Sequence, residues 1–161
     1  MTPVKLLLEI LAVLAIGWVS GAEIGSWFGI QPIVSKLPYD QQVYLEQAML
    51  KSFGRIMPLI MPFSAVVVIL LGIFSRHDST VVMWLRFVAA ACIVITIATT
   101  LIINVPINNL TAKWEMTESF ETWTRIRTKW HLFQGLRGGL FLLSFLLLII
   151  AGTIQHNNPR V

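Results

Sequence analysis

The stretch FQGLRGGLFLLSFLLLIIAGTI, residues 133–154, decides the fold. It is nearly all Leu, Ile and Phe, and as a helix it is long enough to cross the hydrocarbon core of a bilayer, which takes about 20 residues. Similar apolar stretches predict three more spans, at about residues 6–30, 56–74 and 81–105. The sequence therefore predicts an all-α integral membrane protein, a four-helix bundle in which residues 1–161 form a single transmembrane domain.

The composition agrees with lipid as the solvent of this chain. Hydrophobic residues make up 56% of it and charged residues only 12%, a balance that falls outside the usual range of water-soluble domains. Four spans of about 20 residues use half of the chain or slightly more, which leaves no room for a separate soluble domain. Residues 5–22 could pass for a secretory signal, but the apolar stretch continues through Phe28, so we interpret it as a retained first span.

The connection after span one contains two prolines and a short helix. Pro32 and Pro38 are expected to end the span and turn the chain at the membrane surface. Asp40 can cap a short amphipathic helix that runs through Phe53.

Prolines also mark the next two spans. Pro58 and Pro62 lie one turn apart near the start of span two, where we expect a kink, and span three is expected to end at Pro106. The polar stretch 108–129 is too charged to cross a bilayer. We expect an interfacial helix there that leads into span four.

Basic side chains favour one orientation in the membrane. They lie at segment ends, where they can reach lipid headgroups, and they form no run suited to nucleic acid. The positive-inside rule predicts that the side with more Lys and Arg faces the cytoplasm. We therefore expect a bacterial inner-membrane protein with its long connections in the cytoplasm. The side of the long connections carries Lys36, Lys51, Arg55, Lys113, Arg125, Arg127, Lys129 and Arg137, and the other side carries Lys5, Arg76, Arg86 and Arg160.

Cysteine and histidine usage excludes several redox chemistries. The single cysteine, Cys92, lies in an apolar run, so neither a structural disulfide nor a thiol relay is available. His77, His131 and His156 lie at segment ends, where no pair can ligate a haem between two spans. No carboxylate and histidine cluster has a recognisable metal-ligand spacing. We predict no metal and no cofactor.

Glycines recur every fourth residue in span one, at Gly17, Gly21, Gly25 and Gly29. Such a ridge leaves a groove in which another helix backbone can approach closely. We expect Gly21 or Gly25 to pack against another helix, either within the chain or in a homo-oligomer or larger membrane complex.

Glu23 lies opposite the glycine ridge, on the helix face that also carries Ser20, Trp27 and the more distant Glu9. A carboxylate within a span is costly to insert and usually faces a cavity, a counter-charge or a transport path. Glu23 is therefore a candidate functional residue, and a buried ion pair that only fixes helix packing is the alternative. Either interpretation predicts a buried side chain with a polar partner.

The end of span three offers a group of amide side chains at the depth where lipid gives way to water. Asn104, Asn108 and Asn109 surround Pro106. Asn can bind a hydroxyl or carbonyl group of a ligand, although Asn near Pro is also a common way to end a helix.

Aromatic and basic residues share one face of the segment that leads into span four. Spacings of three and four residues place them within one arc of a helix, and interleaved rings and guanidinium groups are typical of a site for a flat, anionic or phenolic group. An aromatic belt with arginines reaching phosphates is the alternative. We expect Arg137, the deeper arginine, to meet Glu23 or the amides of span three, and Arg127 to meet a ligand or headgroup. The face consists of Phe120, Trp123, Arg127, Trp130, Gln134 and Arg137.

Together these residues resemble the anthrone oxygenase-like family of small four-helix membrane proteins, over nearly the whole chain. The resemblance rests on several short motifs that are weak alone and fairly specific in combination. They are Gly21-Ala-Glu23 with Pro32 and Leu37-Pro38, Phe53-Gly-Arg55-Ile-Met-Pro58, Asn104-Val-Pro-Ile-Asn108-Asn109 with Trp114, and Trp123, Arg127, Trp130 and Arg137.

The resemblance implies oxidation of a lipophilic polycyclic phenol with dioxygen and without a classical redox cofactor. A base would form the carbanion or phenolate, and donors and cations would hold the anion. Glu23 is then the candidate base, and the candidate holders are Asn104, Asn108, Arg127 and Arg137. The chain departs from the family pattern at Gln31 and Gln134, where many bacterial relatives carry histidine.

Two other function classes fit the same residues. One is a non-catalytic accessory or structural subunit of a larger membrane complex, which the glycine ridge and the incomplete catalytic set favour. The other is a proton-coupled exporter that uses Glu23, although small exporters of that type have shorter connections. The preferred hypothesis is a membrane-embedded protein that binds a flat lipophilic ligand and oxidises it.

Overall fold

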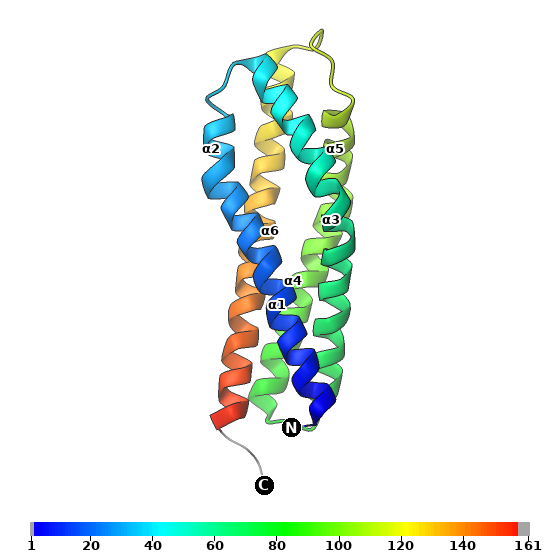
Figure 1. Cartoon of the computed structure of the whole chain (residues 1–161), viewed down its shortest axis with the longest axis vertical. Helices are drawn as coiled ribbons and strands as arrows, with labels where there is room; N and C mark the ends of the chain where they lie inside the picture. Colours follow the sequence, from blue (N-terminus) through cyan, green and yellow to red (C-terminus); the bar gives the residue numbers. More distant parts are fainter. Residues whose placement is uncertain (1, 158–161) are drawn as a thin grey trace.

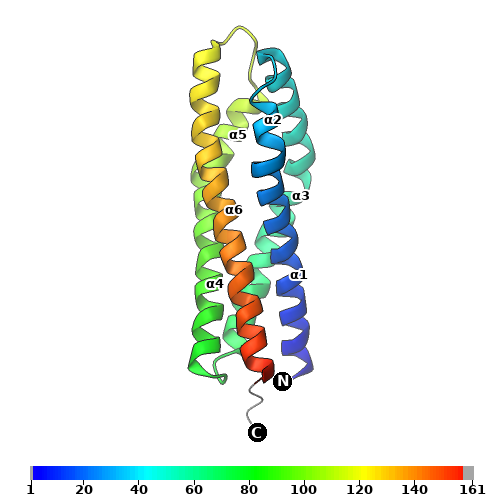
Figure 2. The same ribbon diagram turned by 90° about the vertical axis from the view of Figure 1, so that its left-hand side faces the viewer.

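The computed structural model describes residues 2–157, which are almost entirely helical and contain no strand. Four long antiparallel helical segments form an elongated bundle (Figures 1 and 2). Two of them are continuous helices, α3 (Tyr39–Phe74) and α6 (Phe120–Asn157). The other two are each assembled from three pieces: α1 (Pro3–Gly25), η1 (Ser26–Ile30) and α2 (Gln31–Val34), then α4 (Thr80–Thr99), η2 (Thr100–Asn104) and α5 (Val105–Ala112).

The helices form a closed ring in which α1 and α4 each pack against both α3 and α6. The start of α1 and the end of α6 lie at one end of the bundle, here named the terminal end (Figure 1). The connections 35–38 and 113–119 lie at the opposite end, here named the connection end (Figure 2). All four segments are long and apolar enough to cross a membrane. The predicted membrane four-helix bundle is confirmed.

The segments extend beyond the predicted spans. They contain 32, 36, 33 and 38 residues, or about 48–57 Å of helix at 1.5 Å per residue, whereas the hydrocarbon core of a bilayer is about 30 Å thick. The apolar stretches lie toward the terminal end. The bundle therefore projects from the bilayer at the connection end.

The expected amphipathic helix, residues 40–53, is not a separate element. It is the first part of α3, which continues through Pro58 and Pro62 to Phe74. Gly54 and Pro58 lie near the junction of the two parts but do not interrupt the helix, and a proline inside a packed membrane helix is tolerated when its neighbours stabilise the helix. The interfacial helix expected before span four is likewise continuous with it, as α6.

The predicted ends of spans one and three at Pro32 and Pro106 are wrong, because each helix passes its proline. A proline in an α-helix clashes with the carbonyl four residues earlier and cannot donate to it. Here a π-helical segment comes just before each proline-containing piece, and the backbone N–H of Gln31 donates to the carbonyl of Ser26, five residues earlier. Val105 donates to Thr100 in the same way. The wider turns let both helices continue.

The apolar core fills the half of the bundle nearer the terminal end. Small side chains from α1 and α4 meet larger ones from α3 and α6, and Ala12, Ala89, Leu71 and Phe141 are all inaccessible to solvent. The bulkier Leu, Ile and Val side chains that remain exposed face outward, as expected for a surface in contact with lipid.

Within residues 2–157 the glycine ridge makes one close contact. A Cβ added to Gly17 would lie 2.9 Å from the ring of Phe145 on α6, whereas one added to Gly21, Gly25 or Gly29 would meet nothing within 4 Å. The prediction that Gly21 or Gly25 packs against another helix of this chain is therefore wrong. Contact of these glycines with a second subunit stays a prediction.

A buried ionic network closes the terminal end. Arg86 of α4 is inaccessible to solvent and donates to Glu9 of α1 at 2.8 Å, to Asp78 at 2.8 Å and to Gln155 of α6 at 2.7 Å. It also donates to the hydroxyl of Ser75, and Lys5 pairs with Asp78. From the sequence, Arg86 counted only as a basic residue in the positive-inside rule, and Glu9 only as a more distant residue on the helix face of Glu23. In the structure the two side chains join the ends of the helices.

Candidate functional site

A cavity of about 280 Å³ lies in the half of the bundle nearer the connection end. Its walls are mainly apolar and come from α3 on one side and from α4, η2 and α5 on the other. Polar side chains of α1, η1, α2 and α6 complete it. The principal apolar residues are Met49, Leu50, Phe53, Met57, Pro58, Met61, Ile97, Leu101 and Val105, and the polar ones are Glu23, Ser26, Gln31, Glu46, Thr100, Asn108, Gln134 and Arg137, together with Trp130.

The end of the cavity that lies deeper in the bundle carries the first of two carboxylate–guanidinium pairs. Arg137 donates to Oε2 of Glu23 through Nε at 3.1 Å and through Nη2 at 2.9 Å. Gln134 donates to the same oxygen at 2.6 Å and accepts a hydrogen bond from Arg137. Glu23 is only 2% exposed. The predicted burial of Glu23 and its pairing with Arg137 are therefore confirmed.

One oxygen of Glu23 receives all three of these hydrogen bonds. The described part of the chain supplies no hydrogen bond to Oε1, and it supplies none from Nη1 of Arg137. Both residues line the cavity. A ligand can therefore meet the Glu23–Arg137 pair at a carboxylate oxygen and at a guanidinium nitrogen.

The second pair joins Glu46 of α3 to Arg127 of α6, nearer the connection end. Glu46 is 3% exposed and lines the cavity, and its Oε1 lies 2.5 Å from Nη2 of Arg127. Nη2 of Arg127 is engaged by this ion pair, whereas Nε and Nη1 have no hydrogen-bond partner within residues 2–157. The guanidinium instead lies 4.2 Å from the ring centre of Trp130 and 5.7 Å from that of Trp123.

Trp130 connects the aromatic face of α6 to the end of the third segment. Its indole Nε1 donates to Oδ1 of Asn108 at 2.7 Å. Because this bond uses the amide oxygen of Asn108, the amide nitrogen is left as a donor beside the cavity that both residues line.

The other predicted site residues lie outside the cavity wall. Arg127 lies behind Glu46 and Trp130, and Asn109 is exposed. Trp123 is buried and donates to Gln42 at 3.1 Å, so it packs the connection end. Asn104 is inaccessible to solvent, and its amide nitrogen and oxygen have no hydrogen-bond partner in the described range. Direct ligand contacts of these four residues stay predictions.

The sequence analysis missed Glu46 and gave Gln31 no role. Glu46 was assigned to a surface helix, where a carboxylate needs no explanation. The available signal was the spacing of Val43 and Glu46, which places both on one face of a helix, and the continuous α3 buries them together. Gln31 is 2% exposed, lines the cavity, and its Oε1 has no hydrogen-bond partner among the residues described.

No metal site is apparent within residues 2–157, where no group of three or more His, Cys, Asp or Glu side chains could hold an ion. The polar groups of the cavity are two carboxylates, one guanidinium, three amides and two hydroxyls. Such a set can accept a proton and stabilise an anion on a bound molecule.

Comparison with protein families finds one match, to the family described as anthrone oxygenase, over residues 49–147. The match covers more than half of the chain. This chain belongs to the anthrone oxygenase family. Searches of curated proteins and of solved structures find no match.

The range matched to the anthrone oxygenase family contains only part of the cavity. Asn108, Trp130, Gln134 and Arg137 lie within residues 49–147, whereas three of the buried polar groups precede that range, namely Glu23, Gln31 and Glu46. The family resemblance at Glu23 therefore rests on the sequence motifs alone.

Proposed function

We propose that the cavity binds a flat, lipophilic ligand of polycyclic, phenolic or quinone-like character, and that this family member oxidises an anthrone with dioxygen. The observation that supports the proposal is a cavity with apolar walls and a buried carboxylate at each end, in a member of the anthrone oxygenase family. Apolar walls with a few convergent polar groups are typical of small-molecule sites.

The chemistry needs proton transfer and anion stabilisation. An anthrone carries a carbonyl and a methylene at opposite positions of its central ring. Oxidation to the anthraquinone replaces the two methylene hydrogens with one oxygen atom of dioxygen, and the second oxygen atom leaves as water. A base forms the enolate that reacts, and donors hold its oxygen. Glu23 is the base candidate from the sequence, and Asn108 and Arg137 are holders that line the cavity.

Oxygen consumption tests the activity directly. The full chain in lipid nanodiscs should form anthraquinone from anthrone faster than protein-free nanodiscs, which report the uncatalysed oxidation. Absorbance of the quinone and an oxygen electrode should give equal molar rates. Rates equal to those of the protein-free nanodiscs would contradict the proposal.

A substitution at the cavity mouth tests whether the ligand occupies this cavity. Gly54 lines the cavity and is exposed, and a Cβ there meets nothing within 4 Å. We expect Gly54→Phe to place its ring in the mouth and weaken anthrone binding about tenfold or more, at least 1.4 kcal/mol, as measured by calorimetry in nanodiscs. Gly139→Phe is the matched control, because Gly139 is equally open but lies outside the cavity. Equal binding by both variants would place the ligand elsewhere.

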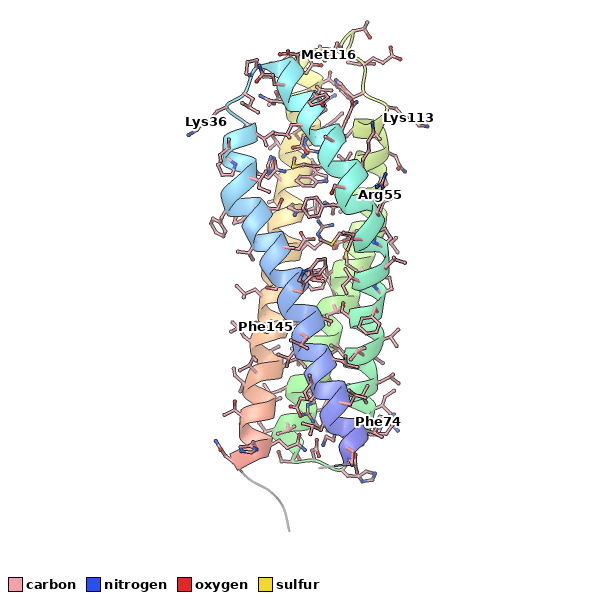
Figure 3. The ribbon with its side chains drawn as sticks, viewed as in Figure 1. Lys36, Arg55, Phe74, Lys113, Met116 and Phe145 are labelled. Carbon is pink, nitrogen blue, oxygen red and sulfur yellow. The ribbon has the colours of Figure 1, made fainter. Side chains whose placement is uncertain are left out.

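We also propose that the connection end faces the cytoplasm of a bacterial inner membrane. Figure 3 shows Lys36, Arg55 and Lys113 near this end, pointing away from the bundle. Arg127 and Arg137 at one end and Lys5 and Arg86 at the other are buried in ion pairs, and Arg160 lies outside the described residues. The remaining exposed basic residues strongly favour the connection end. They are Lys36, Lys51, Arg55, Lys113, Arg125 and Lys129 there, against Arg76 at the terminal end. Labelling of a cysteine introduced at position 113 or 76 in intact cells would show which end is outside.

The alternative function, an accessory subunit of a larger membrane complex, is favoured by one observation. Gly21, Gly25 and Gly29 form an exposed strip that no side chain of the described chain covers. Contact of this strip with a second copy or another subunit stays a prediction, which cross-linking in native membranes would test.

A further inference from the structure

We propose that Glu46, rather than Glu23, accepts the proton from the substrate, while Arg137 holds the substrate's carbonyl oxygen at the other end of the cavity. This inference rests on the proposed function and names the groups that perform its first step. It adds a catalytic residue that lies outside the range matched to the family.

The shape of the substrate sets the first condition. The methylene that loses a proton and the carbonyl that becomes the enolate oxygen lie across the central ring from each other. A base and an oxygen-holding donor must therefore approach the ring from opposite sides. Two groups in direct contact with each other cannot meet this condition.

Glu23 and Arg137 are in direct contact. Arg137 donates twice to Oε2 of Glu23, the shorter of the two bonds being 2.9 Å, and Gln134 donates to the same oxygen. Arg137 and Gln134 therefore engage the Glu23 carboxylate at Oε2, and a base at this position would lie beside the donor that holds the substrate oxygen. The free Nη1 of Arg137, by contrast, is a cationic donor in the cavity wall, suited to a developing oxyanion. This end of the cavity therefore fits the carbonyl oxygen.

Glu46 lies at the opposite end. Its partner Arg127 precedes Arg137 by ten residues on the same helix, or about 15 Å along the axis. The ion pair with Arg127 engages Oε1 of Glu46, so Oε2 is the oxygen that would accept the proton. Glu46 also lines the cavity and is 3% exposed, so a base there is shielded from bulk water.

Gln31 supplies an independent indication that a ligand occupies the Glu46 end. Its Oε1 is buried, has no hydrogen-bond partner within residues 2–157, and belongs to a side chain in the cavity wall. A buried acceptor without a donor costs free energy. A phenolic hydroxyl on the outer ring of a hydroxylated anthrone would satisfy it, which makes hydroxylated anthrones the substrate class that fits best.

The proposed step is a proton transfer without a redox change. The C–H bond of the methylene breaks, the proton moves to a carboxylate oxygen of Glu46, and the electron pair delocalises onto the carbonyl oxygen. Arg137 then holds an enolate oxygen. Arg127, which does not line the cavity, acts as a positioning residue that holds the carboxylate of Glu46 through their ion pair.

Hydrogen–deuterium exchange isolates this step from oxidation. The full chain in nanodiscs in D₂O, without dioxygen, should accelerate deuterium incorporation at the methylene of anthrone relative to protein-free nanodiscs, as read by mass spectrometry. Glu46→Gln should lower the exchange rate at saturating anthrone about 100-fold or more, the usual contribution of a general base, while anthrone still binds. Glu121→Gln, on the exposed first turn of α6, is the control and should behave as the parent protein does.

A second pair of variants separates the two carboxylates. Glu23→Gln should raise the anthrone concentration needed for half-maximal exchange, because Arg137 loses its partner, while exchange continues at saturation. Glu46→Asp keeps the charge beside Arg127 and should give an intermediate rate in a folded protein. Loss of saturated exchange in Glu23→Gln with full exchange in Glu46→Gln would overturn the inference and make Glu23 the base. A parent protein that neither binds anthrone nor accelerates exchange would overturn the proposed function itself.

Discussion

Arg86→Met is expected to lower the thermal stability of the protein strongly in mild detergent. The arginine is inaccessible to solvent and donates to groups from α1, α3 and α6 and from the turn before α4. Its removal leaves the carboxylate of Glu9, whose side chain is 14% exposed, without its partner, and breaking a largely buried ion pair costs about 3–5 kcal/mol. This is a large part of the 5–15 kcal/mol that stabilises a typical domain.

Thermal unfolding in detergent measures the effect, and we expect Tm to fall by roughly 10 °C or more. Arg76→Met is the matched control, because Arg76 lies at the same end of the bundle and is exposed. Arg86→Lys should also be destabilised, since one ammonium group cannot reproduce a planar fork that serves four acceptors. A Tm within a few degrees of the parent protein for Arg86→Met would contradict the structural role of the network.

Arg137→Met is expected to have an effect of similar size, and to abolish anthrone binding in the protein that remains folded. The substitution removes both hydrogen bonds to Glu23 and leaves this buried carboxylate with Gln134 alone. The cost is again about 3–5 kcal/mol. Unlike Arg86, Arg137 lines the cavity, so its loss also removes the cation that we propose holds the substrate oxygen.

The double variant Glu23→Gln/Arg137→Met separates stability from function. Without the buried carboxylate, Tm should recover toward that of the parent protein, because no unpaired charge remains. Anthrone binding should not recover. Arg55→Met, an exposed change on α3, should alter neither quantity. Recovery of binding in the double variant would show that Arg137 acts only through Glu23.

The fold was largely predictable because lipid imposes a simple rule on sequence. A long apolar stretch must form a helix, since no water is present to satisfy its backbone, and four such stretches are evident here. The helix ends were not predictable from proline positions. Four prolines lie inside helical segments, because π-helical turns and helix packing accommodate residues that would end a helix in water. They are Pro32, Pro58, Pro62 and Pro106.

The candidate site was predictable where a residue violated the rules of its surroundings. Glu23 and Arg137 are charged groups in apolar stretches, so a partner was required, and their contact followed. Glu46 lies in polar sequence, where nothing marks a side chain as buried, and Gln31 directly follows the predicted end of span one. Their positions depend on how four helices meet beyond the bilayer, which is a property of packing and not of local pattern.

The π-helical segment η1 sets the rotational phase of the first helix. Eight residues of regular α-helix would place Gln31 about 80° around the axis from Glu23, but one residue taken up by the wider turn reduces the offset to about 20°. Both side chains can therefore line one cavity from a single helix. Deleting one residue of Ser26–Ile30 would restore regular winding and leave Gln31 at the same offset of about 20°, because the wider turn accommodates one added residue. The wider turn around one added residue thus keeps Gln31 in the polar wall of the cavity.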